Sequence, residues 1–245
     1  MLISIITVCY NSEKTISNTF ESILQQSYVE YEYIIIDGGS TDNTVNIIKE
    51  YMPRFKGKMR YTSEPDKGIY DAMNKGIAKC KGTLIGIVNS DDWYEPDTLE
   101  KVVHAYQGND HEVIYGMQRT IRNEKEFAIL FYHHDFLPLQ MITHPTCFVT
   151  RKTYEKYGVF LANEYRSAAD YELMLRFYNS NMVVFTPVYS VLSNFRLGGI
   201  SSSHVGQMET AKLQRKLGTM STKKYIITIL KNRINSIIGN DWNSL

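Results

Sequence analysis

Short β-rich segments alternate with helical patterns along the first half of the chain, and each of these segments ends in polar residues. We expect strands at 2–9, 31–36, 59–62 and 84–88, with helices between them and after the last one. Strands that alternate with helices pair in parallel through right-handed crossovers, and the helices then cover both faces of the sheet. The predicted fold class is therefore α/β.

The polar clusters are Tyr10-Asn11, Asp37, residues 64–67 and Asp91-Asp92. In open α/β sheets, ligands bind beyond the carboxyl ends of the strands. The four clusters should therefore line one crevice at that edge of the sheet.

The pattern changes after about residue 110. We expect strands at 112–117, 127–132, 182–185 and 189–195, a charged turn or hairpin at 119–126, and helices around Tyr154 and over 169–179. No Pro/Gly linker separates the halves, so the second half is interpreted as a mixed extension of the same domain.

Composition excludes several classes of protein. The 245 residues carry a formal net charge of +1, which gives no electrostatic case for nucleic acid. The three cysteines form no CxxC pair, and no apolar run approaches the roughly 18 residues that a membrane span needs. The N-terminus has no basic region typical of a signal peptide, so we expect a cytoplasmic protein.

Adjacent carboxylates at Asp91-Asp92 end the apolar run 84–88 and repel each other. The chain has neither GxGxxG nor a Walker A loop, so a diphosphate bound here needs another source of positive charge. Mn²⁺ or Mg²⁺ would supply it, because both prefer oxygen ligands. The alternative is that the two residues only cap the following helix.

Four stretches in order resemble the family-2 glycosyltransferases, which have a GT-A fold: "SIITVCYNSEKTI", "YIIIDGGSTDNT", "EPDKGIYDAMNKGIAKCKG" and "NSDDWYEPDTL". Further on, "HPTCFVTRKTYEKYGVF" and "AADYELMLR" resemble the acceptor half, and "GIYDAMNKGI" resembles enzymes of bacterial surface-polysaccharide synthesis. The resemblance implies a Rossmann-like, mostly parallel sheet with a nucleotide-sugar half at 1–110 and a mixed acceptor half at 111–218.

The resemblance also implies residue roles in the donor half. Thr7 and Tyr10 would frame the base, and Asp37 would accept a hydrogen bond from its imide N–H, unless it only holds a Gly-Gly-Ser turn. Asp91 would reach the ribose or the diphosphate, and Asp92 would ligate the metal. The remaining expected substrate contacts are Asp66, Lys67, Asp71, Asn74 and Arg196. Many relatives carry Arg where this chain has Met73, so Lys67 or Lys75 would supply the charge there.

The general base implied by the resemblance is Asp170, at the start of the 169–179 helix. Relatives often have Glu where this chain has Ala169, and loss of that like charge would lower the pKa of Asp170. A helix cap is the alternative role, and Glu172 or Glu164 would be the next candidate base.

Three other features carry weaker expectations. The stretch "FRLGGISSSH" resembles a loop that closes over the diphosphate, in which Arg196 would pair with phosphate and His204 could touch the metal, or both could be solvated. His144 is a candidate acceptor-site residue. His133-His134 is expected to be an exposed pair rather than a metal site.

Together these features predict an inverting, hexosyltransferase-type enzyme. It would use a nucleoside-diphosphate sugar (UDP favoured, GDP or dTDP possible) and a glycan or lipid-linked acceptor, and the metal would make a general acid unnecessary. A nucleotidyltransferase and a non-catalytic nucleotide-sugar-binding module are the alternatives. Both Asp92 and Asp170, which a binding module would be expected to lose, are present.

The tail at 219–245 is basic and amphipathic, with apolar residues on one broad helical face and no acid before Asp241. Such a helix could lie on anionic lipid at the inner face of the cell membrane, or pack on protein.

Overall fold

The computed structural model describes residues 1–198 and 204–238, without the side chains of 204 and 232–238. In chain order the elements are β1 (Ile3–Cys9), α1 (Ile16–Leu24), β2 (Tyr31–Asp37), α2 (Thr44–Tyr51), β3 (Met59–Ser63), α3 (Ile69–Ile77), β4 (Leu84–Ile87), β5 (Trp93–Tyr94), α4 (Thr98–Ala105), β6 (Glu112–Arg122), β7 (Lys125–Leu130), β8 (Phe148–Thr150), α5 (Arg151–Tyr157), α6 (Ala169–Asn179), β9 (Val184–Arg196), α7 (His204–Lys216) and α8 (Thr222–Ile238). Single 3₁₀ turns occur at Met52–Phe55, His134–Phe136 and His144–Thr146.

The first four expected strands form a parallel segment of the sheet, in the order β3-β2-β1-β4. Cys9 is paired with Asp37, and Asp37 with Ser63, so the carboxyl ends of β1, β2 and β3 stand in one row. This confirms the parallel arrangement predicted from the alternation of strands and helices. It also brings the polar residues that follow these strands to one edge.

Beyond β4 the same sheet continues in the order β8-β6-β9-β5, and β7 pairs with β6. All of these strands except β5 come from the second half of the chain. Two short strands, β5 and β8, were not predicted. The two strands expected at 182–185 and 189–195 are one strand, β9, whose pairing with β6 shifts register around Gly116 and Met117. The expected turn at 119–126 is narrower, because β6 continues to Arg122 and the chain reverses at Asn123 and Glu124, both with positive φ.

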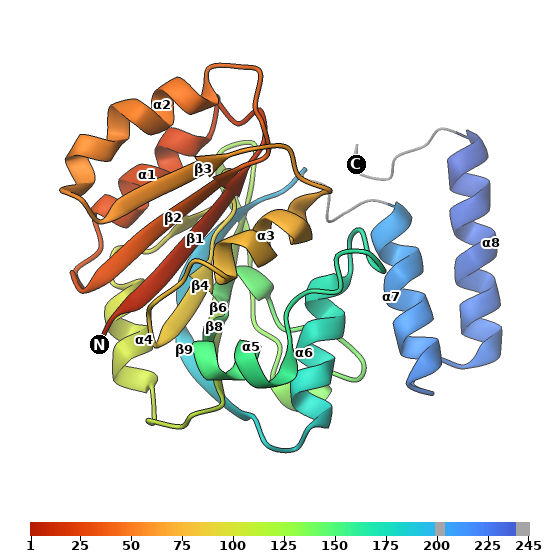
Figure 1. Ribbon diagram of the computed structural model, residues 1–245. Helices are drawn as coiled ribbons and strands as arrows, with labels where there is room; N and C mark the ends of the chain where they lie inside the picture. The colour runs from red at the N-terminus through yellow and green to blue at the C-terminus, as the bar shows by residue number, and fades with distance from the viewer. Residues whose placement is uncertain (199–203, 239–245) are drawn as a thin grey trace.

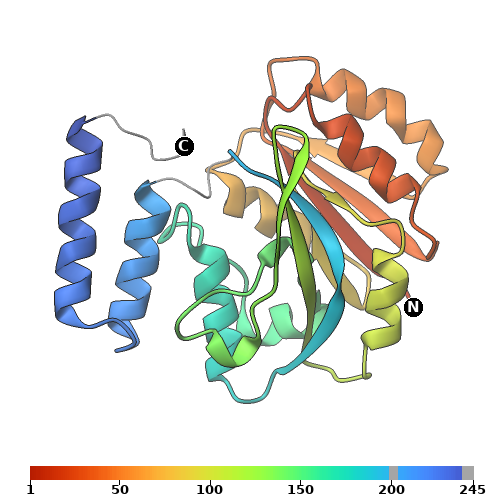
Figure 2. The ribbon, with the colours of Figure 1, turned by 180° about the vertical axis from the view of Figure 1, so that it is seen from behind.

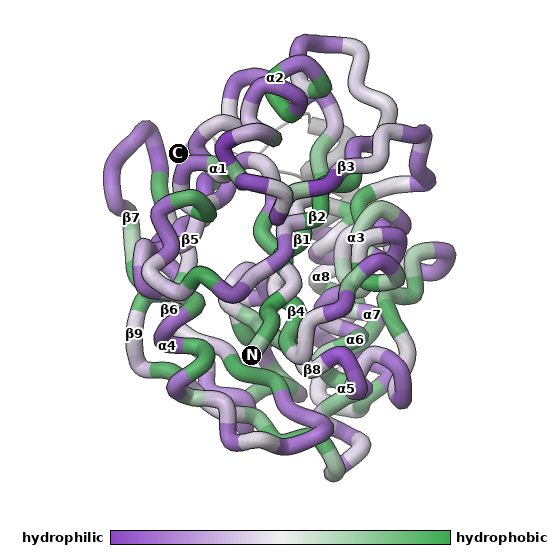
Figure 3. The backbone as a smooth tube through the Cα atoms, turned by 60° about the vertical axis from the view of Figure 1, so that its left-hand side comes forward, coloured by the Kyte–Doolittle hydropathy of each residue, from purple (hydrophilic) through white to green (hydrophobic). Residues whose placement is uncertain are grey.

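Alternation along the central strands builds a core on each face of the sheet. Ile6 and Val8 of β1 pack on the face covered by α3, α5 and α6 (Figure 1). Ile3 and Ile5 pack on the opposite face, under α1, α2 and α4 (Figure 2). The central strands are buried on both faces and mostly apolar, although β1 also buries Ser4 and Thr7. Figure 3 shows β4 as largely hydrophobic and the β6–β7 turn as hydrophilic.

Asn11 and Ser12 could cap a helix, but α1 begins only after Thr15, whose side chain makes no capping bond. Asn11 has a left-handed backbone (φ 49°), and its side-chain oxygen accepts from the Thr41 amide at 2.8 Å. The Ser12 hydroxyl lies 2.8 Å from that of Ser90. These two residues tie the loop after β1 to the loops after β2 and β4.

Helix α7 packs on the domain through the buried side chains Ala211 and Leu213, and α8 lies outside α7 (Figure 1). On α8, Ile226, Ile227 and Leu230 are exposed. Within the described part of the chain, no helix is both long and apolar enough to cross a membrane.

Candidate active site

The carboxylate of Asp37 ends β2 and is fully buried. It accepts hydrogen bonds from the backbone amides of Gly39 and Ser40 at 3.2 and 3.0 Å, and from the hydroxyls of Ser40 and Ser63. This is the turn-holding geometry that the sequence left open as an alternative. A contact between Asp37 and a nucleotide base stays a prediction.

The two residues expected to frame the base lie in different environments. Thr7 is fully buried within β1, and its hydroxyl lies 2.8 Å from that of Tyr33. Tyr10 is 62% exposed just after β1, at the edge where the polar clusters meet. An exposed aromatic ring here is available for stacking on a base, whereas the hydroxyl of Thr7 is bonded to Tyr33 inside the core.

The loop between β3 and α3 folds back over the end of β2. A Cβ at Gly38 would come too close to Oδ2 of Asp66, so a larger residue here would force the Asp66 carboxylate to move. Oδ1 of Asp66 accepts from the Gly68 amide at 2.8 Å, and Asp71 accepts from the Lys67 amide at 3.1 Å. The expected contacts Asp66, Lys67 and Asp71 therefore stand together beside Gly38.

Asn74 uses its whole amide group on the backbone of Phe160. Its Nδ2 donates to the Phe160 carbonyl at 2.9 Å, and its Oδ1 accepts from the Phe160 amide at 3.0 Å. The pair joins α3 to the loop before α6. An opening of about 250 Å³ lies beside it, lined by Lys67, Asp71, Asn74 and residues 160–164.

Lys75 is the other lysine, besides Lys67, expected to supply the positive charge missing at Met73. It pairs instead with Glu64 at 3.0 Å and with Asp71 at 3.4 Å. It holds the same loop from the side of α3.

The Asp91-Asp92 pair follows β4 as expected, but the two carboxyls differ. Asp92 is fully buried, and its Oδ1 accepts from the Arg196 amide at 3.0 Å while its Oδ2 accepts from Asn89 Nδ2 at 3.3 Å. Burial and the neighbouring charge of Asp91 raise the pKa of Asp92 well above its ordinary value. Asp91 is partly exposed, and burial raises the pKa of its carboxyl as well.

An unsatisfied oxygen stands next to these acids. Oδ1 of Asn89 is buried and has no hydrogen-bond partner among the described residues. A buried acceptor without a donor is costly, and the pKa values of both carboxyls stay raised although the charge of Arg196 opposes the shift. These oxygen donors fit a hard divalent cation, and Asp91, Asp92 and Asn89 are the residues that could hold it.

Arg196 crosses from β9 to this corner. Its guanidinium pairs with Glu124 at 2.5 Å and lies 5.4 Å from the centre of the Trp93 ring. Its Nε is buried without a partner in the described structure. Residues 199–203 and the side chain of His204 lie outside the described residues, so the expectations for that loop and for His204 are not addressed.

Asp170 is the second residue of α6, and Tyr70 of α3 donates to its Oδ1 at 2.9 Å. Since α3 begins at the carboxyl edge of the parallel strands, Tyr70 brings Asp170 to the edge where Asp37 and Asp91 lie. Tyr70 stacks on Phe160, and the buried His144 packs edge-on against the same ring. Burial lowers the pKa of His144, and the charge of Asp170 opposes that shift.

The sequence did not single out three residues that shape this site: Tyr70, Asn89 and Glu209. Tyr70 and Asn89 lie inside the quoted motifs and could have been found as polar neighbours of the expected ligands. Glu209 lies on α7 and accepts backbone bonds from the residues just before α6. No sequence signal connects it to them.

His133 and His134 are only partly exposed, so the expectation of an exposed pair is wrong. His134 Nδ1 lies 2.8 Å from the Tyr115 hydroxyl, and its ring stacks on Phe185. With Asp135 they form a group whose potential metal-ligand atoms lie within 4.8 Å of one another.

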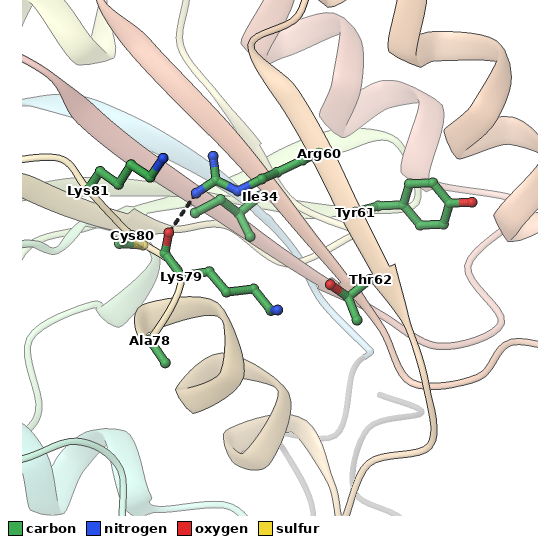
Figure 4. A pocket seen from close by; sticks show the side chains of 8 residues that line it. All are labelled: Ile34, Arg60, Tyr61, Thr62, Ala78, Lys79, Cys80 and Lys81. Carbon is green, nitrogen blue, oxygen red and sulfur yellow. Dashed lines mark hydrogen bonds between the residues drawn. The ribbon is translucent and has the colours of Figure 1, made fainter.

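A larger opening of about 450 Å³ lies between β3 and the end of α3 (Figure 4). Arg60 spans it, donating to the Lys79 carbonyl at 2.6 Å and pairing with Glu32 at 2.7 Å. The opening contains none of the expected site residues.

The model of the family described as "Glycosyl transferase family 2" matches residues 4–178. A PGL/p-HBAD biosynthesis glycosyltransferase of Mycobacterium bovis is 28% identical over 209 residues, covering 83% of this chain and 80% of that protein. The chondroitin synthase of Escherichia coli is 28% identical over 246 residues, covering 94% of this chain and 35% of that protein.

Solved structures share the fold. Staphylococcus aureus TarS 1-349 in complex with UDP-GlcNAc has a TM-score of 0.71 at 19% identity, covering 89% of this chain and 65% of that chain. The mannosyltransferase PcManGT from Pyrobaculum calidifontis, in complex with GDP-Man and Mn²⁺, has a TM-score of 0.68 at 17% identity, covering 98% of this chain and 71% of that chain. The chain thus has the GT-A fold that the sequence motifs implied.

Proposed function

Because this chain belongs to glycosyl transferase family 2 and is a glycosyltransferase, we propose that it moves a hexose from a nucleoside-diphosphate sugar to an acceptor hydroxyl with inversion of configuration. The observation that carries the proposal is the placement of Asp170 by Tyr70 at the edge of the sheet that also presents Asp91. One carboxylate is available as a base and the other for the donor.

The donor is proposed to lie over the ends of β1, β2 and β4. The exposed ring of Tyr10 stacks on the base, and the buried Asp37 either meets the base directly or fixes the turn that does. Neighbours bound to UDP-GlcNAc and to GDP-Man support a nucleotide sugar as the donor. A UDP-sugar is favoured, with GDP and dTDP as alternatives.

A divalent cation, Mn²⁺ or Mg²⁺, is proposed to bind at the end of β4. The sequence assigned its ligation to Asp92, but that carboxylate is fully buried and bonded to Arg196 and Asn89. Asp91 is partly exposed and is the better direct ligand, with Asp92 fixing the loop beneath it. When bound, the cation would stabilise the charge that grows on the leaving diphosphate. A neighbour bound to Mn²⁺ supports this assignment.

Asp170 is proposed as the general base. Its Oδ1 is held by Tyr70 and by the amide of Tyr171, both at 2.9 Å, which leaves Oδ2 to take the proton from the acceptor hydroxyl. As that proton leaves, the hydroxyl oxygen bonds to the anomeric carbon and the bond from that carbon to the diphosphate breaks. A single displacement of this kind inverts the anomeric configuration.

The acceptor is proposed to be a glycan or a lipid-linked sugar. The relatives named for chondroitin synthesis and PGL/p-HBAD biosynthesis support a glycosylated product. The opening beside Asn74 and Phe160 is the proposed entry for this acceptor, because it adjoins the loop that leads to α6. The family match favours sugar transfer over the nucleotidyltransferase alternative.

Contact with a membrane is proposed through α8. Lys223, Lys224 and Lys231 stand on the same helix as the exposed apolar side chains of Ile226, Ile227 and Leu230, and this helix contains no acidic residue. Basic helices with an exposed apolar face bind anionic lipid surfaces. Such binding would bring the enzyme to a lipid-linked acceptor.

A donor screen tests the proposed function. The protein is incubated with Mn²⁺ and a panel of UDP-, GDP- and dTDP-sugars, and release of the nucleoside diphosphate is measured by mass spectrometry. One donor should be consumed, and EDTA should stop the reaction. The protein could instead bind a donor tightly and release no nucleoside diphosphate from it, even after candidate acceptors are added. That result would support a non-catalytic binding module.

A further inference from the structure

Helix α6, which carries Asp170, has no cap of its own. Its N-cap residue is Ala168, which has no side-chain acceptor. Within the first turn, Asp170 accepts from the Tyr171 amide at 2.9 Å, and this bond leaves the amide of Ala168 itself without a local acceptor. The first amides of a helix lack intrahelical partners and need an acceptor from elsewhere. For the amide of Ala168, and for the amides of the two residues before it, the acceptor comes from another part of the chain.

Glu209 on α7 supplies that acceptor. Its Oε2 accepts from the amides of Ser167 and Ala168 at 2.9 and 3.0 Å, and its two oxygens accept from the amide of Arg166 at 3.0 and 3.1 Å. Three consecutive amides that converge on one carboxylate form an anion-binding nest. Charge-assisted bonds of this type are stronger than neutral ones.

Two further contacts fix α7 beside the start of α6. Leu213 is buried in the same core as Ala168 and Tyr171. Gln214 donates to the Leu139 carbonyl at 2.6 Å, and the neighbouring Leu137 carbonyl accepts from the Tyr171 hydroxyl at 2.8 Å. Figure 1 shows α7 beside α6 and its preceding loop. Glu209 therefore extends from a helix that Leu213 and Gln214 hold in place beside α6.

We propose that Glu209 is a positioning residue for Asp170, acting by capping α6 from α7. This inference rests on the proposed function, in which Asp170 is the base. Asp170 lies two positions after Ala168, so any rotation of the helix start changes the direction of its carboxylate and its bond to Tyr70. Misplacement of a reacting group by about 1 Å can cost on the order of 10²-fold in rate.

Glu209 is not itself the base. Both of its oxygens are occupied by amides that stay bonded as long as the loop keeps its conformation. The charge of Glu209 also contributes to the raised pKa of Tyr70, after burial and Asp170, which places it close to the same group. Its influence on transfer should therefore act through the geometry of Asp170.

The test compares Glu209→Gln with Glu50→Gln in the full chain. Glu50 is exposed on α2, so its substitution removes the same charge at a distance from α6. Three quantities are measured: kcat for transfer at saturating donor, donor affinity by calorimetry with Mn²⁺ present, and hydrogen exchange of the amides of residues 166–168.

For Glu209→Gln we expect kcat to fall by about 10- to 100-fold, because the base is displaced rather than removed. Donor affinity should stay within about three-fold, since no nucleotide contact is proposed for α7, and exchange at 166–168 should become at least about ten-fold faster. Glu50→Gln should change none of the three. If Glu209→Gln fails to fold, Glu209→Asp serves instead, because it keeps the charge and withdraws the carboxylate by one methylene.

Faster exchange at 166–168 with an unchanged kcat would overturn the proposal, since Glu209 would then be structural only. Equal losses of kcat and donor affinity would also overturn it. Failure of the proposed function looks different: the wild type would transfer no sugar, or Asp170→Asn would keep the full rate, while the exchange measurement would still report on the contact with Glu209.

Discussion

The hydroxyl of Tyr70 donates to Oδ1 of Asp170 at 2.9 Å and joins α3, in the first half of the chain, to α6, in the second half. Burial, followed by the charge of Asp170, raises the pKa of Tyr70, so the phenol stays protonated and acts as the donor. This fixes the direction of the carboxylate. It also means that the proposed base depends on a residue from the other half of the fold.

Asp170→Asn tests the base directly. The amide keeps the shape of the side chain and can still accept from Tyr70, but it cannot take a proton. Transfer should fall by about 10²- to 10⁴-fold, the usual contribution of a positioned general base. Donor affinity, measured by calorimetry with Mn²⁺, should stay within a few-fold.

Glu172→Gln is the matched control for Asp170→Asn, because Glu172 stands on the same turn of α6 and pairs with Arg176 at 2.6 Å. It should retain most of the activity. If Asp170→Asn retains full transfer while Glu172→Gln loses it, the base has been assigned to the wrong residue. Loss of donor binding in Asp170→Asn would place Asp170 in the nucleotide site.

Asn74→Ala should destabilise the protein by about 2–4 kcal/mol, because it removes two hydrogen bonds and leaves the Phe160 amide and carbonyl without partners. Transfer should fall as well, since these bonds hold the loop that leads to α6. The free energy of unfolding in urea gives the first quantity. Asn46→Ala, which removes one exposed bond to Asn43, is the control and should cost well under half as much.

The central parallel strands and α6 could be predicted because their signals are local. Alternating elements specify β1 to β4, and the helix expected at 169–179 is the observed α6. The strands β5 and β8 contain two and three residues and form only because β9 and β4 offer edges to pair with. Such short segments have no periodicity of their own.

The site was only partly accessible to sequence reasoning. A pair of carboxylates after a strand indicated Asp91, whereas only the family resemblance indicated Asp170, because an Asp at a helix start is also an ordinary cap. The partners of these residues come from distant positions: Arg196 for Asp92, Phe160 for Asn74, and Glu209 for the start of α6. Only the fold specifies which polar side chain is exposed and which forms hydrogen bonds with backbone groups.

Asp91→Asn should abolish metal-dependent donor binding, with a loss of transfer of more than about 10²-fold, the scale of one preorganised electrostatic element. In EDTA, with no metal bound, the same substitution should stabilise the folded protein. Burial raises the pKa of Asp91 in the folded state, so its contribution to stability is complete below the ordinary carboxyl value of about 4 and is lost as pH rises through the raised value.

In EDTA at pH 7, Asp91→Asn should therefore unfold at a higher temperature than the wild type, and the difference should shrink as pH approaches about 4. With Mn²⁺ and donor present the order should reverse, because only the wild type gains binding energy in the folded state. Asp110→Asn, an exposed residue paired with Lys152, controls for loss of one charge. A wild type that is fully active in excess chelator would refute the metal assignment.

The double substitution Ile226→Ser with Leu230→Ser tests the proposed membrane contact of α8. Both side chains are about half exposed, so their loss should scarcely change the melting temperature of the protein in solution. On vesicles containing anionic lipid, each inserted side chain would contribute on the order of 1–2 kcal/mol, so binding should weaken by at least about ten-fold. Co-sedimentation with such vesicles measures this, and Val29→Ser, an exposed apolar position far from α8, should leave it unchanged.

Raising the salt concentration should weaken wild-type binding to these vesicles, because salt screens the attraction between Lys223, Lys224 and Lys231 and the anionic lipid surface. If vesicle binding is unaffected while the melting temperature drops, the exposed face of α8 serves protein packing, and the membrane proposal fails.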